Sequence, residues 1–487
     1  MARKIAKTVI FILLAVILLT AYFDVFMFKT NDGIWQMKKF YEENDNSIDV
    51  IFLGSSHMFV NANTPTLWDE YGIASYDLGG SVQPYWNTYH YLIEAFKTQK
   101  PKVVVFDIFT AADVNTEYFA YENVIKNVFG MKLSENKLEA IKDSVTESDR
   151  NCYYYEYPTF HKRYVDDITK SDFTYKKSNY RDLNCWKGET LMYRSAPLPR
   201  PDDSVINDTT IGELTPKNEE FLRKIIELCK ENDTPLLLVL NPYHVLDYQM
   251  PVFNKVQQIA TETGTEYINF NLLYDEIGID FDNDFSDACH MKYSGSANFS
   301  RYLAKELKSR YDIPDRRGQQ GYESYDDMAR LYKKVTSYED EKSCEDIQQF
   351  VSDIDMAGRT IVCSVVGNYG QDERYDEYAK ALRAYGIDLS DVSGNSIWVI
   401  DDGNIVYGAG SSGVYNYRKR LSRYNTLSIE TIEEMYTDGS GVYTVPKLRM
   451  NTTYYSKADD GVRIAVYDKE LDSIVIDKVF TSTKGDE

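Results

Sequence analysis

Short apolar segments alternate with amphipathic stretches over residues 48–312 of the chain. The apolar segments predict strands at 48–53, 75–78, 102–106, 235–240 and 267–269. The amphipathic stretches predict helices at 66–71, 84–98, 219–232, 252–263 and 294–311. Apolar strands that alternate with helices are typical of a parallel sheet with both faces covered. We therefore predict an α/β domain of three layers over residues 29–314.

A long insertion, at about 113–215, interrupts this alternation and is rich in tyrosine and charged residues. Loops of this length in a compact domain are usually functional or mobile. A lid, a docking surface and a simple surface decoration all remain open as interpretations.

The first residues of the chain predict a membrane anchor. Arg3, Lys4 and Lys7 lie in a tail at 1–7, and a mostly apolar run follows at 8–28. About 20 apolar residues span a bilayer, and the basic end stays in the cytoplasm. The run is longer than a signal-peptide core, and no small-x-small cleavage site follows it. We expect a single-pass signal-anchor in the cell membrane, with the bulk of the chain extracytoplasmic. A cleaved signal peptide would send the rest of the chain to the same place.

The last third of the chain has a different pattern. Residues 315–343 are polar and charged and predict a partly helical linker. Residues 344–487 predict a strand at 359–366, a helix at 375–385, and hairpins at 396–407 and 461–479. The first hairpin turns at Asp402-Gly403, a strong turn signal. We predict a smaller α+β domain.

Charge and cysteine usage limit the function classes. The chain has 487 residues and a net charge of −22, which argues against nucleic acid as a partner. The six cysteines include no C-x-x-C pair, and the histidines and acids do not reach metal-ligand spacing, so we predict no metal and no cofactor. Pairing of Cys152 with Cys185 is left open.

Polar residues follow the predicted strands at their carboxyl ends, where parallel sheets carry their chemistry. They are residues 54–57, Gly79, Gly80, Asp107 and residues 241–244. Among these, Ser56 follows a buried strand in a tight Gly-Ser-Ser turn. A serine is a weak nucleophile until a base activates it. The alternative is that Ser56 serves only as the N-cap of the next helix.

Asp287 precedes His290 by three residues on a turn that leads into a helix. This spacing can place both side chains on one side, where the carboxylate holds the imidazole tautomer and stabilises the imidazolium. We therefore predict Ser56 as nucleophile, His290 as base and Asp287 as its partner. A cysteine nucleophile at Cys289 has no base assigned to it. His57, Asp107, Asn241 and His244 are candidate substrate contacts, with structural roles as the alternative for His57 and Asp107.

These segments resemble the SGNH/GDSL hydrolase superfamily over residues 47–312. Leu53-Gly54-Ser55-Ser56-His57 is similar to its first block and Asp287-Ala-Cys-His290 to its last. Gly79, or its neighbour Gly80, matches the second block. The resemblance implies a flavodoxin-like sheet, a Ser56–His290–Asp287 triad, and an oxyanion hole formed by the amides of Ser56 and Gly79 or Gly80.

The third family block, G-x-N-D, is absent, and Asp107-Ile-Phe-Thr stands in its place. Asn241 or Asn115 would have to replace its side-chain donor. In this departure the sequence resembles the membrane-anchored subset of the superfamily, which includes the teichoic-acid D-alanylation protein (DltD) and the alginate O-acetylation proteins. That likeness implies a cell-envelope glycan or acylated sugar as partner, and a membrane-bound O-acyltransferase (MBOAT) as companion.

The C-terminal segment is similar to ILEI/PANDER-type domains. Residues 461–467 and 475–480 resemble the opening of that domain, and 360–366 and 396–400 its later half, in permuted order. The resemblance implies glycan binding, with a packing or spacer domain as the alternative.

The sequence thus predicts an extracytoplasmic serine esterase or O-acyltransferase of a cell-envelope polysaccharide. The alternative is a catalytically silent SGNH-like scaffold for a glycan or a membrane acyltransferase. The charge of −22 favours a neutral, hydroxyl-rich glycan over an anionic one unless the binding site is locally basic.

Overall fold

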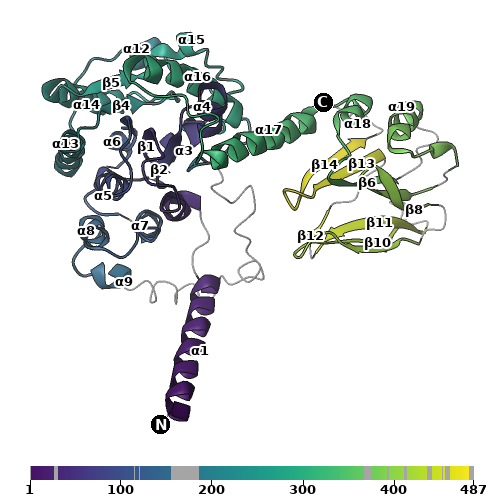
Figure 1. Cartoon of the computed structure of the whole chain (residues 1–487). Helices are drawn as coiled ribbons and strands as arrows, with labels where there is room; N and C mark the ends of the chain where they lie inside the picture. Colours follow the sequence, from purple (N-terminus) through teal and green to yellow (C-terminus); the bar gives the residue numbers. More distant parts are fainter. Residues whose placement is uncertain are drawn as a thin grey trace. The chain divides into compact units, whose positions relative to one another are not determined.

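The computed structural model describes residues 2–26, 31–114, 116–119, 121–154, 186–366, 374–391, 394–410, 414–435, 441–451, 453–455 and 461–481. The chain divides into two compact units, Met1–Tyr332 and Lys333–Glu487. Figure 1 shows the elements of both units.

The first unit is built on a parallel sheet of five strands in the order β2-β1-β3-β4-β5. The strands are β1 (Val50–Gly54), β2 (Ser75–Gly79), β3 (Val103–Asp107), β4 (Leu236–Leu240) and β5 (Glu266–Asn269). They confirm the strands predicted from the apolar segments. In this order the chain reverses its direction of winding between β1 and β3, and such reversals are where parallel sheets bind ligands.

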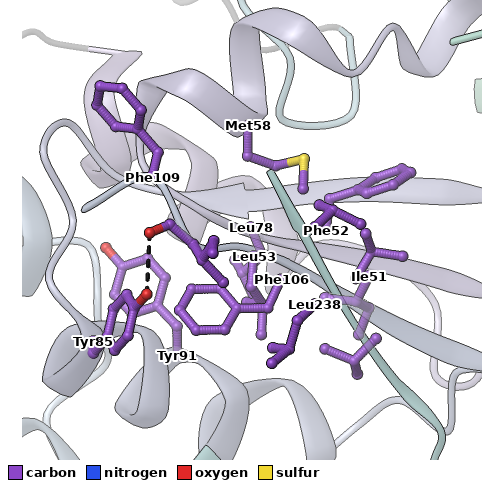
Figure 2. Packing of buried hydrophobic residues seen from close by; sticks show 14 of the residues in the cluster. Ile51, Phe52, Leu53, Met58, Leu78, Tyr85, Tyr91, Phe106, Phe109 and Leu238 are labelled. Carbon is purple, nitrogen blue, oxygen red and sulfur yellow. Dashed lines mark hydrogen bonds between the residues drawn. The ribbon is translucent and has the colours of Figure 1, made fainter. Parts of the chain in front are cut away.

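Every residue of β1 to β4 is buried. This is the burial pattern of a parallel sheet with helices on both faces. One group of helices packs around α5 (Tyr85–Phe96), with α8 (Glu135–Ser144) and α13 (Pro216–Glu231). A second group contains α3 (Ser56–Asn61), α4 (Thr64–Tyr71) and α16 (Tyr293–Arg310). Figure 2 shows the core where strand residues such as Leu53, Phe106 and Leu238 pack together.

Capping residues mark several helix boundaries. The side chain of Asn63 caps α4 and that of Thr215 caps α13. Helix α14 (Met250–Thr263) ends at Gly264, whose φ of 68° is left-handed. The remaining elements of the unit are η1 (Asn31–Trp35), α2 (Gln36–Phe40), α6 (Thr110–Asp113), α7 (Tyr121–Val128), α9 (Arg150–Tyr154), α12 (Asp203–Ile206), η2 (Phe270–Leu273) and α15 (Tyr274–Ile277).

The N-terminal helix α1 (Ala2–Phe26) contains the predicted membrane span. Its segment Arg3–Tyr22 has a mean hydropathy of 2.4 and no buried share. It is the one helix among the described residues that is long and apolar enough to cross a membrane. A signal sequence would have the same length and composition.

The predicted linker at 315–343 is largely the helix α17 (Glu323–Ser343), and the boundary between the units falls inside it. Its first part belongs to the first unit, where Asp326 accepts a hydrogen bond from the Trp68 indole at 3.0 Å. Its second part belongs to the second unit, where Lys334 and Tyr338 contact Asp468 at 2.8 and 2.6 Å.

The second unit contains two antiparallel sheets. The first has the order β14-β13-β6-β7-β8, from β6 (Arg359–Val366), β7 (Ser396–Asp401), β8 (Asn404–Ala409), β13 (Gly461–Asp468) and β14 (Ser473–Thr481). It confirms both predicted hairpins and the strand at 359–366. The short helices are α18 (Ile347–Asp353), α19 (Tyr375–Leu382), η4 (Arg383–Tyr385) and η5 (Leu389–Asp391).

The second sheet was not predicted from the sequence. Its order is β12-β11-β10-β9, from β9 (Asn416–Arg420), β10 (Thr426–Met435), β11 (Val442–Met450) and β12 (Thr453–Tyr454). Side chains of one face, including Leu427, Ile429 and Leu448, pack against Val362 and Val399 of the first sheet. The alternation of apolar and polar residues breaks at Thr431-Ile432 in β10 and at Val445-Pro446 in β11, so neither strand shows a regular period of two.

Candidate active site

The turn between β1 and α3 presents Ser56 at the carboxyl edge of the parallel sheet. Gly54 ends β1 with a φ of 146°, a conformation that favours glycine. Ser55 is the N-cap of α3, and its Oγ accepts the backbone N–H of His57 at 3.3 Å. The interpretation of Ser56 as the cap is therefore wrong. The Ser56 side chain is not needed to cap the helix and is partly exposed.

The loop before α16 is shaped by Asp287. Its Oδ1 accepts the backbone N–H groups of Cys289 and His290, each at 2.9 Å. The same carboxylate lies 2.9 Å (Oδ2) and 3.0 Å (Oδ1) from the Nδ1 of the His290 ring. One side chain thus holds both the turn and the ring, as the spacing of three residues predicts.

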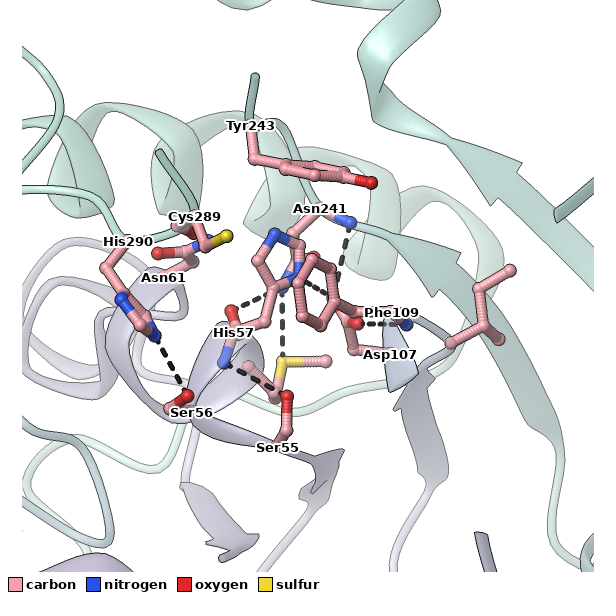
Figure 3. Close-up of polar contacts among 12 residues, drawn as sticks. Ser55, Ser56, His57, Asn61, Asp107, Phe109, Asn241, Tyr243, Cys289 and His290 are labelled. Atoms are coloured by element: carbon pink, nitrogen blue, oxygen red, sulfur yellow. Dashed lines mark hydrogen bonds and ion pairs between the residues drawn. The ribbon is translucent and has the colours of Figure 1, made fainter. Parts of the chain in front are cut away.

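His290 and Ser56 meet across the site. The His290 Nε2 lies 2.9 Å from the Ser56 Oγ, a contact drawn in Figure 3. Because the Nδ1–H faces the Asp287 carboxylate, the Nε2 accepts the hydrogen bond from the serine hydroxyl. The side chains of His290 and Asp287 are 24% and 50% exposed, so the three groups lie at the surface of the unit, where a substrate can approach.

The electrostatics of this chain of hydrogen bonds favour a charged Asp287. Partial burial by itself raises its pKa, but hydrogen bonds from the His290 ring and the Cys289 backbone outweigh this and lower the pKa to about 2. A carboxylate that stays ionised can hold the imidazole tautomer and stabilise an imidazolium. The arrangement can therefore move a proton from Ser56 to His290.

Asn61, at the end of α3, is a site residue that the sequence analysis missed. Its Nδ2 donates to the carbonyl of Cys289 at 3.2 Å, and its Oδ1 accepts the N–H of Met291 at 2.8 Å. The two bonds fix the backbone on either side of His290, so the helix that carries Ser56 also positions the predicted base. An asparagine in a short helix carries no sequence signal for this role.

The end of the insertion borders the same loop. Ala196 and Leu198 donate their backbone N–H groups to Phe285 and Phe281, at 2.8 and 2.9 Å. The backbone N–H of Tyr293 donates to the Met192 carbonyl at 2.8 Å. Residues 192–199 thus line the His290 loop, whereas 155–185, with Cys185 and His161, lie outside the described residues.

His244 lies beside this loop, as expected for a residue at the end of β4. Its backbone N–H donates to Ala288 at 3.2 Å, and its ring Nδ1 donates to the Pro199 carbonyl at 2.7 Å. The imidazole is partly exposed, so its Nε2 remains suited to a substrate contact.

His57 and Asp107 form a buried pair instead of lining the surface. Their Nδ1 and Oδ2 atoms are 2.8 Å apart, and both side chains are fully buried. The His57 ring stacks on Phe109 at 4.4 Å and meets Tyr243 edge-on at 4.9 Å (Figure 3). The burial does not agree with the predicted substrate contact and favours the structural alternative, because solvent cannot reach either group.

Asn241 belongs to the same buried network. Its backbone N–H donates to Asp107 Oδ2 at 3.3 Å and its side-chain Nδ2 to the His57 carbonyl at 3.3 Å. The side chain has no exposed surface, so the predictions of a substrate contact and of an oxyanion donor at Asn241 do not agree with its position. Asn115, the other candidate donor, lies outside the described residues.

The two glycines predicted for the oxyanion hole, Gly79 and Gly80, differ in how they contact Gly54. The Gly80 N–H donates to the Gly54 carbonyl at 3.4 Å. Gly79 ends β2 opposite Gly54, and a Cβ on Gly79 would lie 2.6 Å from the Gly54 oxygen. Both glycines are buried. The Ser56 N–H, at the first position of α3, has no partner within its own helix.

Two alternative chemistries are also constrained by the structure. Burial, with the charges of Asp287 and Asp113, raises the pKa of Cys289 to about 12, so this thiol is not a thiolate near neutral pH. In the described part of the chain, no group of three or more His, Cys, Asp or Glu side chains is placed to hold a metal ion.

Neither comparison with known proteins adds a relative: no protein-family model matches the chain, and no curated protein is significantly similar to it.

Proposed function

We propose that the protein is a membrane-anchored serine esterase or O-acyltransferase that acts outside the cytoplasm on O-acyl groups of a cell-envelope polysaccharide. The observation that carries the proposal is the chain of hydrogen bonds from Ser56 Oγ through His290 to Asp287, with 2.9 Å at each step. The resemblance of the Ser56 and His290 segments to SGNH hydrolases supports the acyl-transfer chemistry.

In the proposed mechanism, the Ser56 Oγ attacks the carbonyl carbon of an O-acyl group while the His290 Nε2 takes the hydroxyl proton. The Asp287 carboxylate stabilises the resulting imidazolium. The tetrahedral intermediate collapses when the sugar oxygen leaves with the proton from His290, and the acyl group stays on Ser56. Water or an acceptor hydroxyl then attacks the acyl-enzyme with its proton passing to His290, and Ser56 regains its proton.

The oxyanion would be held by backbone amides, those of Ser56 and Gly79. Removal of one donor aimed at the developing charge costs about 3 kcal/mol of transition-state stabilisation in a serine hydrolase. Transfer to water makes the protein an esterase, and transfer to a sugar hydroxyl makes it an O-acyltransferase. In the second case, a membrane-bound O-acyltransferase would be the companion that supplies the acyl group.

A fluorophosphonate probe tests the mechanism directly, since it reacts with an activated serine. We expect the full-length protein to be labelled at Ser56, and Ser56→Ala and His290→Ala to lose labelling. Ser55→Ala is the matched control, because it removes the neighbouring hydroxyl and weakens only the cap of α3 by about 1 kcal/mol. Labelling that persists in Ser56→Ala would contradict the assignment.

A catalytically silent glycan-binding scaffold is the second candidate. It is favoured by the end of β3, where Asp107 is buried against His57 and offers no side-chain donor to an oxyanion. A protein that binds an acylated glycan but resists the probe would support this alternative.

A further inference from the structure

The second sheet of the C-terminal unit has one face turned away from the core. Residues alternate along a strand, and Tyr417, Leu427 and Leu448 pack into the core between the two sheets. Residues of the opposite parity therefore form an outer face. It carries four cations: Arg418, Arg420, Lys447 and Arg449.

The strand register places these cations side by side. Arg418 on β9 pairs with Ser428 on β10, Ser428 pairs with Arg449 on β11, and Arg449 pairs with Tyr454 on β12. Lys447 lies in the next row, opposite Glu430. The basic sheet face is defined as Arg418, Arg420, Lys447, Arg449 and Tyr454. It extends over the sheet β12-β11-β10-β9, of which Figure 1 labels β10, β11 and β12.

Few carboxylates lie near the cations of this face among the described residues. Arg449 pairs with Glu430 at 2.5 Å, and Glu430 is the one acid that the register places among them in the described strands. The Lys447 ammonium lies 4.3 Å from the centre of the exposed Tyr454 ring. Arg418 is exposed, and no carboxylate pairs with Arg418 or Lys447 among the described residues. Residues 416–423 contain no acid, in a chain of net charge −22. Of their four basic residues, Lys419 lies on the opposite face of β9 and pairs with Asp401 at 2.5 Å.

The spacing of the cations favours a polymer over a small anion. Neighbouring strands lie about 4.8 Å apart and alternate residues about 7 Å apart along a strand. The cations are therefore spread over the face and do not converge on one point. Duplex DNA carries one charge per about 1.7 Å, and a strongly acidic chain repels such a dense polyanion. A polysaccharide with one negative group per repeat has a lower charge density, closer to that of the face.

We propose that the basic sheet face binds an anionic polysaccharide, one with carboxylate or phosphodiester groups repeated along a hydroxyl-rich chain. Arg418 and Lys447 would pair with successive anionic groups, and the Tyr454 ring would hold the lysine ammonium in place. The binding is independent of the Ser56 chemistry. It supplies the local basic surface that an acidic protein needs to hold an acidic polymer.

The test uses the full-length protein in a neutral detergent and measures binding by calorimetry. The probes are polygalacturonate and poly(glycerol phosphate), which separate carboxylate from phosphodiester groups, with dextran of matched length as the neutral control. We expect binding to one or both anionic polymers, no binding to dextran, and weaker binding when salt rises from about 50 to 200 mM. The absence of binding to both anionic polymers, or equal binding to dextran, would overturn the proposal.

A pair of charge-reversal variants locates the site. Arg418→Glu with Lys447→Glu should weaken binding at least about ten-fold, which is about 1.4 kcal/mol. Lys380→Glu with Arg383→Glu makes the same change of charge on exposed residues of α19 and η4 and should bind like the wild type. Equal loss in both pairs would show that net charge, not this face, controls binding.

Further variants separate folding and other ligands from the proposed role. Arg418→Lys with Lys447→Arg should keep binding, and Arg418→Gln with Lys447→Gln should lose part of it if the charge reversal fails to fold. Ser56→Ala should bind the anionic polymers normally, so a failure of the esterase proposal can be distinguished from a failure of the polysaccharide-binding proposal. Duplex DNA, or phosphatidylglycerol vesicles, bound more tightly than the polysaccharides through the same residues would overturn the proposal in favour of a nucleic-acid or membrane surface.

Discussion

Two histidines of the first unit face aspartates in opposite surroundings. His290 meets Asp287 at the surface, where the carboxylate is half exposed. His57 meets Asp107 where neither group has any exposure. Its Nε2 is buried and has no hydrogen-bond partner among the described residues. A base must exchange protons with substrate, so the exposed pair is suited to catalysis and the buried pair to holding the turn that carries Ser56.

Asp287→Asn should lower the rate of probe labelling at Ser56 by about 10⁴-fold, because an amide at this position favours the wrong His290 tautomer and does not stabilise the imidazolium. Its effect on stability depends on pH. The folded pKa of Asp287, about 2, lies below the usual value of about 3.9. The stabilisation is therefore present above about pH 4 and is lost as the pH falls towards 2.

With half of the carboxylate in solvent, the stabilisation amounts to about 1 kcal/mol. Calorimetric melting of wild type and Asp287→Asn should show a difference at pH 6 that disappears by about pH 2. A constant difference over this range would contradict the role of the charge.

Asp107→Ala should destabilise the first unit by about 3 kcal/mol, because it leaves several buried donors without an acceptor. Those donors are the His57 ring and the backbone N–H groups of Phe109 and Asn241. Urea denaturation measures the loss. The control is Asp143→Ala, which breaks a His90–Asp143 contact of 2.9 Å whose aspartate is 34% exposed; it should cost about 1 kcal/mol or less. Equal losses would show that burial of the His57–Asp107 pair adds nothing.

At the scale of elements, α3 is the part that assembles the candidate site. It begins with Ser56 and ends with Asn61, so the nucleophile and the anchor of the His290 loop lie on one short helix. β1 and the Gly54 turn fix where the helix starts. The loop before α16 lies more than 200 residues further along the chain than β1 and α3, and the fold of the first unit brings it beside them.

Asn61→Ala should slow labelling of Ser56 by about ten-fold or more, because the His290 loop loses both of its bonds to the Asn61 side chain. It should also destabilise the unit by about 2 kcal/mol through the unpaired backbone groups. Asn254→Ala is the matched control: its Nδ2 holds the Asp208 and Thr210 carbonyls of another loop, at 2.6 and 2.9 Å. We expect that control to lose stability but to label at the wild-type rate, and a normal rate in Asn61→Ala would remove the loop from the mechanism.

At the scale of the whole molecule, the chain combines one exposed apolar helix with two compact units. The helix favours attachment to a membrane, and the parallel sheet and the basic sheet face belong to different units. The two proposals thus place polymer binding and acyl-transfer chemistry on separate units.

The N-terminal helix should keep the protein in the membrane. After expression of the full chain, we expect it in the membrane fraction, released by detergent but not by carbonate. Peptide mapping of the purified protein should recover residues 8–26, as a signal-anchor requires. A soluble product that lacks these residues would show a cleaved signal sequence instead.

The strands and principal helices of the first unit could be predicted from the sequence because buried parallel strands are continuous apolar runs. Ser56 could be selected because it follows the end of a predicted strand. Asp287 and His290 could be selected because they are three residues apart on a predicted turn. The second antiparallel sheet could not, because half-exposed strands are identified by alternation, and the alternation is interrupted at Thr431-Ile432 and at Val445-Pro446.

The sequence by itself thus determined the layers of the first unit, the apolar N-terminal helix and the three residues of the candidate triad. Only the tertiary structure decided which histidine is exposed, that Asn61 holds the His290 loop, and that scattered basic residues share one sheet face. The reason is physical: local patterns specify elements, whereas burial, hydrogen-bond partners and the gathering of charge depend on which elements the fold brings into contact.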